Sequence, residues 1–289
     1  MSHAWTKEFW RGLPFIASSN DPASPNVLLG APMDFSASFR PGSRFGPESI
    51  RQVSYNLEEY SLFVGKSLED LSFYDAGDLQ LPFGNVSRSL HLIEEAIRGC
   101  LERGQRTFTI GGDHLISWPC LKAYSQHFPQ LTVVHIDAHA DLRDDYMGEE
   151  RSHATVIGNA LRELPLKDVY QFAIRSATQR EHDTAKRTRF FPFTFVEPLR
   201  TVLGEISGPV YITLDIDAVD PAYAPGVGTP ESGGITPHDL FEGLKLLSAK
   251  NVVGFDLVEV APAYDNAGIT SALAAKLVRE SLLMFGRQP

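Results

Sequence analysis

The chain has few cysteines, no excess of basic residues and no long apolar run. Its 289 residues include only two cysteines, Cys100 and Cys120, so we expect no disulfide framework and two buried free thiols in a reducing compartment. The formal net charge of −10 argues against nucleic acid as a partner, because phosphate binding requires clustered Lys and Arg. No stretch approaches the roughly 18 apolar residues that span a bilayer, and the N-terminus has no apolar signal-peptide core. We therefore expect a cytoplasmic protein without a membrane partner.

Short apolar, β-branched segments alternate with helical patterns along the whole chain. Their near-continuous hydrophobicity is typical of parallel strands that are buried on both faces. Helices are expected from residue 47, over 90–101 and over 269–285, and the strands over 27–30, 72–75, 107–110, 131–136, 169–174, 190–195, 210–214 and 252–255. About eight βα units in an α/β chain fit either a closed barrel or an open sheet. No linker or repeat divides the chain, so we expect one domain over 1–289 with an N-terminal extension over 1–25.

Side chains that can bind hard divalent metals lie in three segments, each directly after an expected strand. They are His114, Asp137, His139, Asp141, Asp215 and Asp217. Because residues two apart in a strand point to the same face, the carboxylates of Asp215 and Asp217 are expected to point the same way. Buried carboxylates are costly unless positive charge lies close to them. These segments contain no Lys or Arg, so a metal is the expected partner.

The alternative is that each segment is a separate helix cap or turn, since Asp is common at helix starts. Four carboxylates and two imidazoles are too many for one closed structural ion. They suit two ions that share bridging carboxylates and hold a water between them. An oxygen-rich set of this kind favours Mn²⁺, with Fe²⁺, Co²⁺ or Ni²⁺ also compatible. Two metals about 3.5–4 Å apart can supply hydroxide near neutral pH, so the sequence predicts a binuclear metal hydrolase.

The three segments resemble signatures of the ureohydrolase (arginase/agmatinase) family. The resemblance rests on Gly-Gly-Asp-His at 111–114, Asp-Ala-His-Ala-Asp at 137–141 and Asp-Ile-Asp-Ala-Val-Asp-Pro at 215–221, and it extends to segments 40–47 and 256–262. It implies an open three-layer α/β/α fold of the arginase type, with a mostly parallel sheet of eight strands. It also implies two Mn²⁺ per subunit, one held by His114, Asp137, Asp141 and Asp215, the other by Asp137, His139, Asp215 and Asp217.

The same resemblance implies three residues with roles in catalysis. Glu259 follows the last expected strand and would orient a planar guanidinium group by paired hydrogen bonds. Metal-bound hydroxide would attack the guanidinium carbon, and His153, which aligns with the family's proton-shuttle histidine, or Asp141 would assist protonation of the leaving amine. The alternatives are an exposed loop glutamate at 259 and a histidine at 153 that begins a helix without chemistry. His135, Asp113 and Asp220 are expected to support the ligands.

Agmatine, cleaved with water to putrescine and urea, is the expected small cationic substrate. Where arginases carry Asn and Ser that help to bind the amino-acid end of arginine, this chain has Arg143 and Glu149. The net acidity of residues 142–151 suits a substrate that ends in an amine. The alternatives are guanidinobutyrase, guanidinopropionase, arginase, formimidoylglutamase and a non-catalytic metal-binding protein of the same fold. The family likeness also implies a homo-oligomer, either a trimer or a hexamer.

Overall fold

A nine-stranded sheet runs through the centre of the protein in the order β1-β5-β2-β6-β11-β10-β7-β8-β9. The structure is a computed structural model that describes residues 9–288, so the first eight residues of the expected extension lie outside it. A separate hairpin pairs β3 (Tyr60–Ser61) with β4 (Lys66–Ser67). The strands of the sheet are β1 (Phe9–Trp10), β2 (Asn26–Ala31), β5 (Phe73–Leu79), β6 (Arg106–Gly111), β7 (Thr132–Ile136), β8 (Asp168–Ile174), β9 (Arg189–Pro192), β10 (Pro209–Asp215) and β11 (Asn251–Val258).

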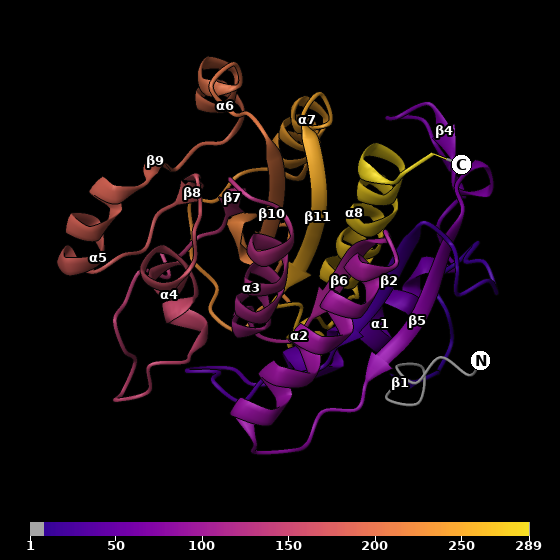
Figure 1. The fold of residues 1–289 in the computed structure, drawn as a ribbon, viewed down its shortest axis with the longest axis horizontal. Helices are drawn as coiled ribbons and strands as arrows, with labels where there is room; N and C mark the ends of the chain where they lie inside the picture. The colour runs from indigo at the N-terminus through magenta and orange to yellow at the C-terminus, as the bar shows by residue number, and fades with distance from the viewer. Residues whose placement is uncertain (1–8, 289) are drawn as a thin grey trace.

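Helices cover both faces of the sheet, which gives three layers (Figure 1). One face packs against α1 (Gly46–Ser54), α6 (Val196–Val202), α7 (Pro237–Leu247) and α8 (Ile269–Phe285). The other face packs against α2 (Val86–Glu102), α3 (Ser117–His127) and α4 (Val156–Glu163), and the short α5 (Gln179–Thr184) lies between β8 and β9 along the chain. The expected α/β/α architecture is therefore confirmed.

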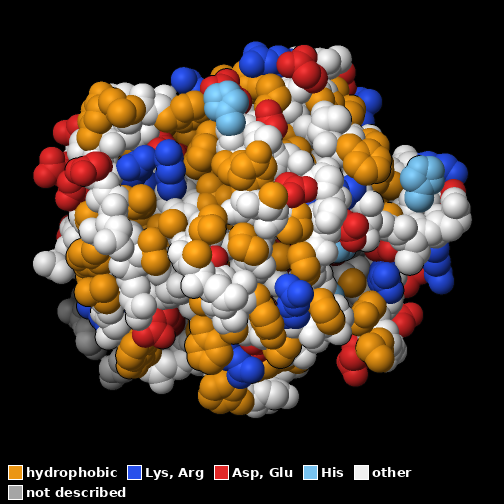
Figure 2. Space-filling model, turned by 180° about the vertical axis from the view of Figure 1, so that it is seen from behind, with side chains coloured by type: hydrophobic (Ala, Val, Ile, Leu, Met, Phe, Trp, Pro, Cys, Tyr) orange, Lys and Arg blue, Asp and Glu red, His pale blue; other side chains and the backbone are white. Residues whose placement is uncertain are grey.

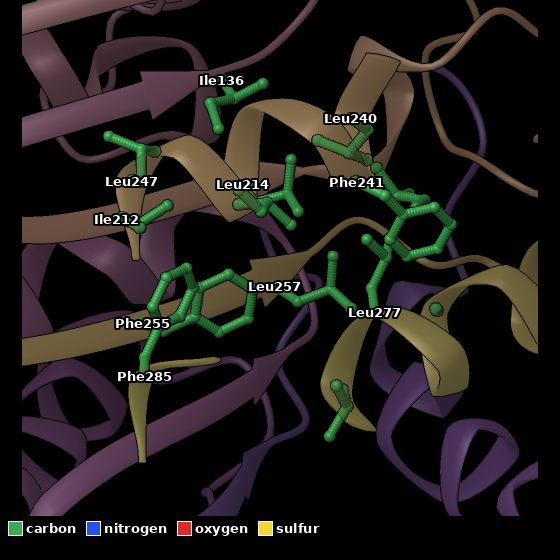
Figure 3. Close-up of a cluster of buried hydrophobic side chains, with 14 of the residues drawn as sticks. Ile136, Ile212, Leu214, Leu240, Phe241, Leu247, Phe255, Leu257, Leu277 and Phe285 are labelled. Carbon is green, nitrogen blue, oxygen red and sulfur yellow. The ribbon is translucent and has the colours of Figure 1, made fainter. Parts of the chain in front are cut away.

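Alternate residues of the central strands supply two separate cores. Leu214 of β10 and Leu257 of β11 pack against Phe241 of α7 and Leu277 of α8 (Figure 3). Tyr211 of β10 points to the opposite face, where its ring centroid lies 4.7 Å from that of a tyrosine in α3. Burial on both faces explains why these strands are continuously apolar in the sequence.

The sheet has nine strands where eight were expected. The additional strand, β1, is antiparallel to β5 and comes from the segment expected to be an extension. Further along this segment Phe15 is fully buried, and its backbone N–H donates to Asp75 Oδ2 at 2.8 Å. The same carboxylate accepts from the buried Arg51 at 2.7 Å. This segment is thus joined to the sheet through β1 and Phe15. Within residues 9–288 the structure contains no helix with the length and apolar character of a membrane span.

Four central neighbours, β6, β11, β10 and β7, place the predicted metal-binding segments at one edge. These strands are parallel, so their carboxyl ends meet at the same edge of the sheet. β6 and β7 come first in the sequence, and β10 and β11, which come later, lie between them in the sheet. A crevice outside the carboxyl ends at such a reversal of strand order is where open α/β sheets bind ligands.

Candidate metal centre and active site

The first cluster of side chains surrounds one nitrogen of His114, which follows β6. Its Nδ1 lies 3.0 Å from Asp137 Oδ2, 3.1 Å from Asp141 Oδ2 and 3.4 Å from Asp215 Oδ2. All four residues are buried. The side chains that end or follow β6, β7 and β10 therefore lie close together, as the sequence predicted.

The second cluster lies beside the first and shares Asp137 with it. His139 Nδ1 lies 3.0 Å from Asp217 Oδ2 and 3.5 Å from Asp137 Oδ1. Asp137 thus turns one carboxylate oxygen toward each histidine. The structure brings together all six side chains that were expected to bind metal, in two groups with a common carboxylate, as a binuclear centre requires.

Backbone N–H groups fix the carboxylates in both clusters. His139 N donates to Asp137 Oδ1 at 2.6 Å, and Asp217 N donates to Asp215 Oδ1 at 2.9 Å. Ala138 N donates to Asp217 Oδ1 at 3.2 Å. The first two contacts arise because the chain turns immediately after its strand, so an aspartate accepts a hydrogen bond from the residue two positions further on, whereas the third joins two different segments.

A buried hydrogen-bond network determines which nitrogen of His114 is free. Asp256 accepts from Tyr211 OH at 2.7 Å, from Ser117 Oγ at 3.0 Å and from Thr213 Oγ1 at 2.7 Å. Since the Thr213 hydrogen goes to Asp256, its oxygen accepts from His114 Nε2, which is 2.9 Å away. In the neutral ring, Nδ1 of His114 is then left with a lone pair that points at the carboxylates of the first cluster.

This arrangement fits divalent cations. A neutral His114 turns a nitrogen lone pair toward three carboxylate oxygens, and such a buried contact is repulsive unless positive charge lies between the atoms. Although burial lowers the pKa of His114, hydrogen bonds to Asp137, Asp141 and Asp215 raise it well above the ordinary value, so the site attracts positive charge, either a proton or a metal ion. Burial, together with the charges of Asp217 and Asp137, raises the pKa of Asp215 well above its ordinary value. Carboxylate oxygens and imidazole nitrogens in this proportion are suitable ligands for Mn²⁺ and related ions.

Removal of metal is expected to make the folded state increasingly unstable as pH rises. Burial raises the pKa of Asp113 to about 7 from an ordinary 3.8, and burial also raises the pKa of Asp215 well above its ordinary value. A raised folded-state pKa contributes stability below the unfolded-state pKa, and this contribution is lost as pH rises through the folded-state pKa. We expect the Tm of EDTA-treated protein to fall between about pH 4 and 7. The fall should be steeper than for Mn²⁺-loaded protein, because bound metal compensates the negative charge of the Asp215 carboxylate. Equal dependence of Tm on pH in the metal-free and the Mn²⁺-loaded protein would contradict this prediction.

Glu259 lies directly beyond β11, and only 8% of it is exposed, so the alternative of an exposed loop glutamate is wrong. Its Oε1 accepts from His114 N at 2.8 Å, which joins it to the first metal cluster. Burial and the charge of Asp113 raise the pKa of its carboxyl well above the ordinary value. Its φ of 66° is left-handed, and a non-glycine residue in this conformation is strained in the way often found at functional sites.

His153 lines a cavity of about 330 Å³ that borders both metal clusters through His139 and Asp141. Its backbone N–H donates to Ser36 Oγ at 2.9 Å, and the Ser36 hydroxyl donates to Asp113 at 3.0 Å. Its Nε2 lies 3.3 Å from Ser38 Oγ. Burial lowers the pKa of His153 below 6.5, which favours the neutral imidazole that can accept a proton at neutral pH.

The acids of residues 142–151 do not form the wall of this cavity. From that segment, which the structure describes in full, Arg143 and Tyr146 line the cavity, and the acids do not. Asp144 instead pairs with Arg162 and Arg180. The expectation that the segment's net acidity receives a substrate amine therefore lacks support in the structure.

Of the three residues expected to support the metal ligands, His135 contacts a predicted ligand, Asp113 acts on another site residue and Asp220 contacts no predicted ligand. His135 Nε2 lies 2.8 Å from Asp137 Oδ2, so this histidine contacts a predicted ligand. Asp113 binds Ser36 and thereby supports His153. Asp220 accepts from the backbone N–H of Ala222 and of two glycines, in a turn rather than at a ligand.

Sequence reasoning missed the polar residues that hold the predicted ligands from neighbouring strands. Thr213 precedes Asp215 by two residues in β10, and this spacing could have revealed it. Gln171 and Asp256 lie on other strands, and only the register of the sheet brings them to the site.

Comparison with known proteins finds similarity over almost the whole chain. The sequence model of the arginase family matches residues 24–284. An agmatinase from Bacillus subtilis is 48% identical over 96% of this chain and 98% of its own length. A guanidinobutyrase from Pseudomonas aeruginosa is 34% identical over 94% of this chain and 90% of its own. The crystal structure of an agmatine ureohydrolase from Thermoplasma volcanium superposes with a TM-score of 0.87 at 32% identity and covers 96% of both chains.

Proposed function

This chain belongs to the arginase family, and on that premise we propose that it is a binuclear manganese hydrolase that cleaves agmatine to putrescine and urea. The observation that carries the proposal is the pair of clusters around His114 and His139, which share Asp137. The 48% identity to an agmatinase over nearly its full length supports the choice of substrate.

Each metal would have four ligands. His114, Asp137, Asp141 and Asp215 would hold one ion, and Asp137, His139, Asp215 and Asp217 would hold the other. When bound, such a pair of divalent ions supplies hydroxide near neutral pH, because it lowers the pKa of water. The position of Asp137 between the two histidines, 3.0 Å from His114 Nδ1 and 3.5 Å from His139 Nδ1, supports its role as a shared ligand.

The chain's own side chains would orient the substrate and move protons. Glu259 would accept paired hydrogen bonds from the guanidinium group and hold its carbon toward the metal centre. The water oxygen forms a bond to that carbon, and the bond from carbon to the substituted nitrogen breaks. The two protons of the water pass to the departing nitrogen, relayed by Asp141 or His153, both of which line the cavity beside the clusters. Urea and putrescine then leave.

Urea release tests the proposal directly. The Mn²⁺-loaded protein would be incubated with agmatine, arginine and 4-guanidinobutyrate, each beside an EDTA-treated control. We expect metal-dependent turnover with a preference for agmatine of at least about tenfold in kcat/KM, or about 1.4 kcal/mol. Retention of metal with no turnover of any guanidine would instead favour a non-catalytic metal-binding protein.

A second candidate substrate is 4-guanidinobutyrate. Arg143 lines the cavity and could pair with the carboxylate at the far end of that compound. The 34% identity to a guanidinobutyrase agrees with this candidate. However, Arg143 Nε lies 3.6 Å from the buried carboxylate of Glu181, which offsets its charge. Agmatine therefore remains the preferred substrate, and the same assay separates the two.

We further propose a cytoplasmic homo-oligomer, either a trimer or a hexamer of the 31.9 kDa chain. The two buried free thiols, Cys100 and Cys120, support a reducing compartment. Figure 2 shows apolar side chains spread over the back of the protein among charges of both signs. Large apolar side chains are also exposed elsewhere along the chain, with exposed fractions of 93% for Leu62, 88% for Met147 and 81% for Phe83. Assembly would cover part of this surface.

A further inference from the structure

A row of five buried polar residues crosses the centre of the sheet directly beneath the predicted metal ligands. The strand register pairs Thr109 with Asp256, Asp256 with Thr213, Thr213 with His135, and His135 with Gln171. Each of the five has an exposed fraction of 0%. Polar side chains are costly in such a position unless they are hydrogen-bonded, so the row calls for an explanation.

Gln171 of β8 has an orientation that its hydrogen bonds fix. Its Nε2 lies 2.8 Å from the carbonyl oxygen of Ala140, which can only accept, so this end of the amide is the NH₂ group. Its Oε1 accepts from Thr188 Oγ1 at 3.1 Å. The second hydrogen on Nε2 points to Nδ1 of His135, 3.0 Å away. His135 Nδ1 must therefore accept a hydrogen bond.

The same reasoning assigns the proton of His135. A ring whose Nδ1 accepts carries its hydrogen on Nε2. That Nε2 lies 2.8 Å from Asp137 Oδ2, so His135 donates to this carboxylate oxygen. The other oxygen, Oδ1, accepts from the backbone N–H of His139 at 2.6 Å. One N–H group thus holds each oxygen of the carboxylate that the two clusters share.

We propose that His135, held by Gln171, is a positioning residue that aims Asp137 at both metals. The N–H groups fix the plane of the carboxylate and leave its remaining lone pairs for the ions. Gln171 also holds Ala140, so one side chain orients Asp137 and the loop between His139 and Asp141. The inference rests on the proposed metal-dependent function, but its test needs no substrate.

Metal binding by two substitutions of His135 tests the proposal. His135→Met removes the donor at similar bulk, whereas His135→Gln can place an amide N–H near the position of Nε2. Metal-free protein would be titrated with Mn²⁺, and free ion measured from its six-line electron paramagnetic resonance signal. We expect about 10- to 100-fold weaker binding for His135→Met, as is usual for lost support of a metal ligand. Rescue to within about fivefold of wild type is expected for His135→Gln.

A matched pair of glutamine substitutions separates positioning from general stability. Gln105 is also buried, and its Nε2 donates to the carbonyl oxygens of Pro22 and Ser24 at 2.8 Å each, away from the predicted ligands. Gln171→Met is expected to weaken Mn²⁺ binding about tenfold or more. Gln105→Met is expected to lower the Tm of the metal-free protein and to leave Mn²⁺ binding unchanged.

Several results would overturn the proposal. One such result is a Mn²⁺ affinity of His135→Met equal to that of wild type. Another is an equal loss of Mn²⁺ affinity in His135→Met and His135→Gln, which would show that the imidazole ring is needed rather than its N–H group. If His135→Met does not fold, equal Mn²⁺ affinities of Gln171→Met and Gln105→Met would overturn it. Failure of agmatine turnover in wild-type protein would reject the proposed substrate and leave these binding results to be judged separately.

Discussion

Asp215→Ala is expected to abolish tight metal binding and to lower kcat about a thousandfold or more, at least about 4 kcal/mol. Asp215 lies at the end of β10, and its Oδ2 is 3.4 Å from His114 Nδ1. The substitution would remove a proposed ligand of both ions and leave the nucleophilic water without activation. Metal content after gel filtration and the rate of urea release from agmatine are the measurements.

Thermal stability shows whether this loss comes from misfolding. Burial and neighbouring charges raise the pKa of Asp215, so its removal relieves repulsion in the metal-free protein. Metal-free Asp215→Ala should therefore have a Tm at least as high as metal-free wild type, but without the increase that Mn²⁺ gives the wild type. Asp220→Asn is a control from the same segment and should retain metal, because its carboxylate caps a turn. An active, metal-free Asp215→Ala protein would disprove the two-metal mechanism.

Glu259→Gln is expected to keep both metals and to lower kcat/KM for agmatine about 30- to 1000-fold, or about 2–4 kcal/mol. The amide oxygen can still accept from His114 N, which Glu259 Oε1 contacts at 2.8 Å. The structure should therefore persist, while the charge that pairs with the guanidinium group is lost. Steady-state kinetics with agmatine, beside metal analysis of the same preparation, measures both effects.

Glu149→Gln is the matched control for this substitution. Glu149 belongs to the acidic segment 142–151 and lines a separate cavity that none of the predicted metal ligands borders. Its substitution should leave KM for agmatine within about twofold. If Glu149→Gln weakens agmatine binding while Glu259→Gln does not, the substrate cation lies toward the acidic segment and Glu259 has no part in binding it.

The elements with strong sequence patterns were predicted closely. The helix expected over 269–285 has those bounds, and each expected strand overlaps an observed one. Five of the six metal-binding candidates were recognisable because Asp and His recur at spacings of two directly after apolar strands, and His114 because it follows a strand in the segment Gly-Gly-Asp-His. In the structure most of these residues lie just beyond the strands, with Asp217 in a short 3-10 helix, so the turns after the strands also determine where the side chains point.

Features that depend on strand pairing were not predictable. His135 and Gln171 are 36 residues apart and meet only because β7 pairs with β8 in one register. β1 is too short to have a periodic pattern, and its pairing with β5 supplies its hydrogen bonds. The directions of the acids in 142–151 depend on partners such as Arg162, which local sequence does not reveal.

The strand order also dictates when the protein can acquire its ions. β6 and β7 are consecutive strands of the central sheet along the chain, yet β10 and β11 separate them, and β10 begins only at Pro209. A nascent chain that has not yet emerged beyond β7 lacks Asp215 and Glu259 and cannot hold His114 and Asp137 at their final separation. Pairing between strands far apart in the sequence is slow, so the complete set of predicted ligands forms only after β10 has paired into the sheet.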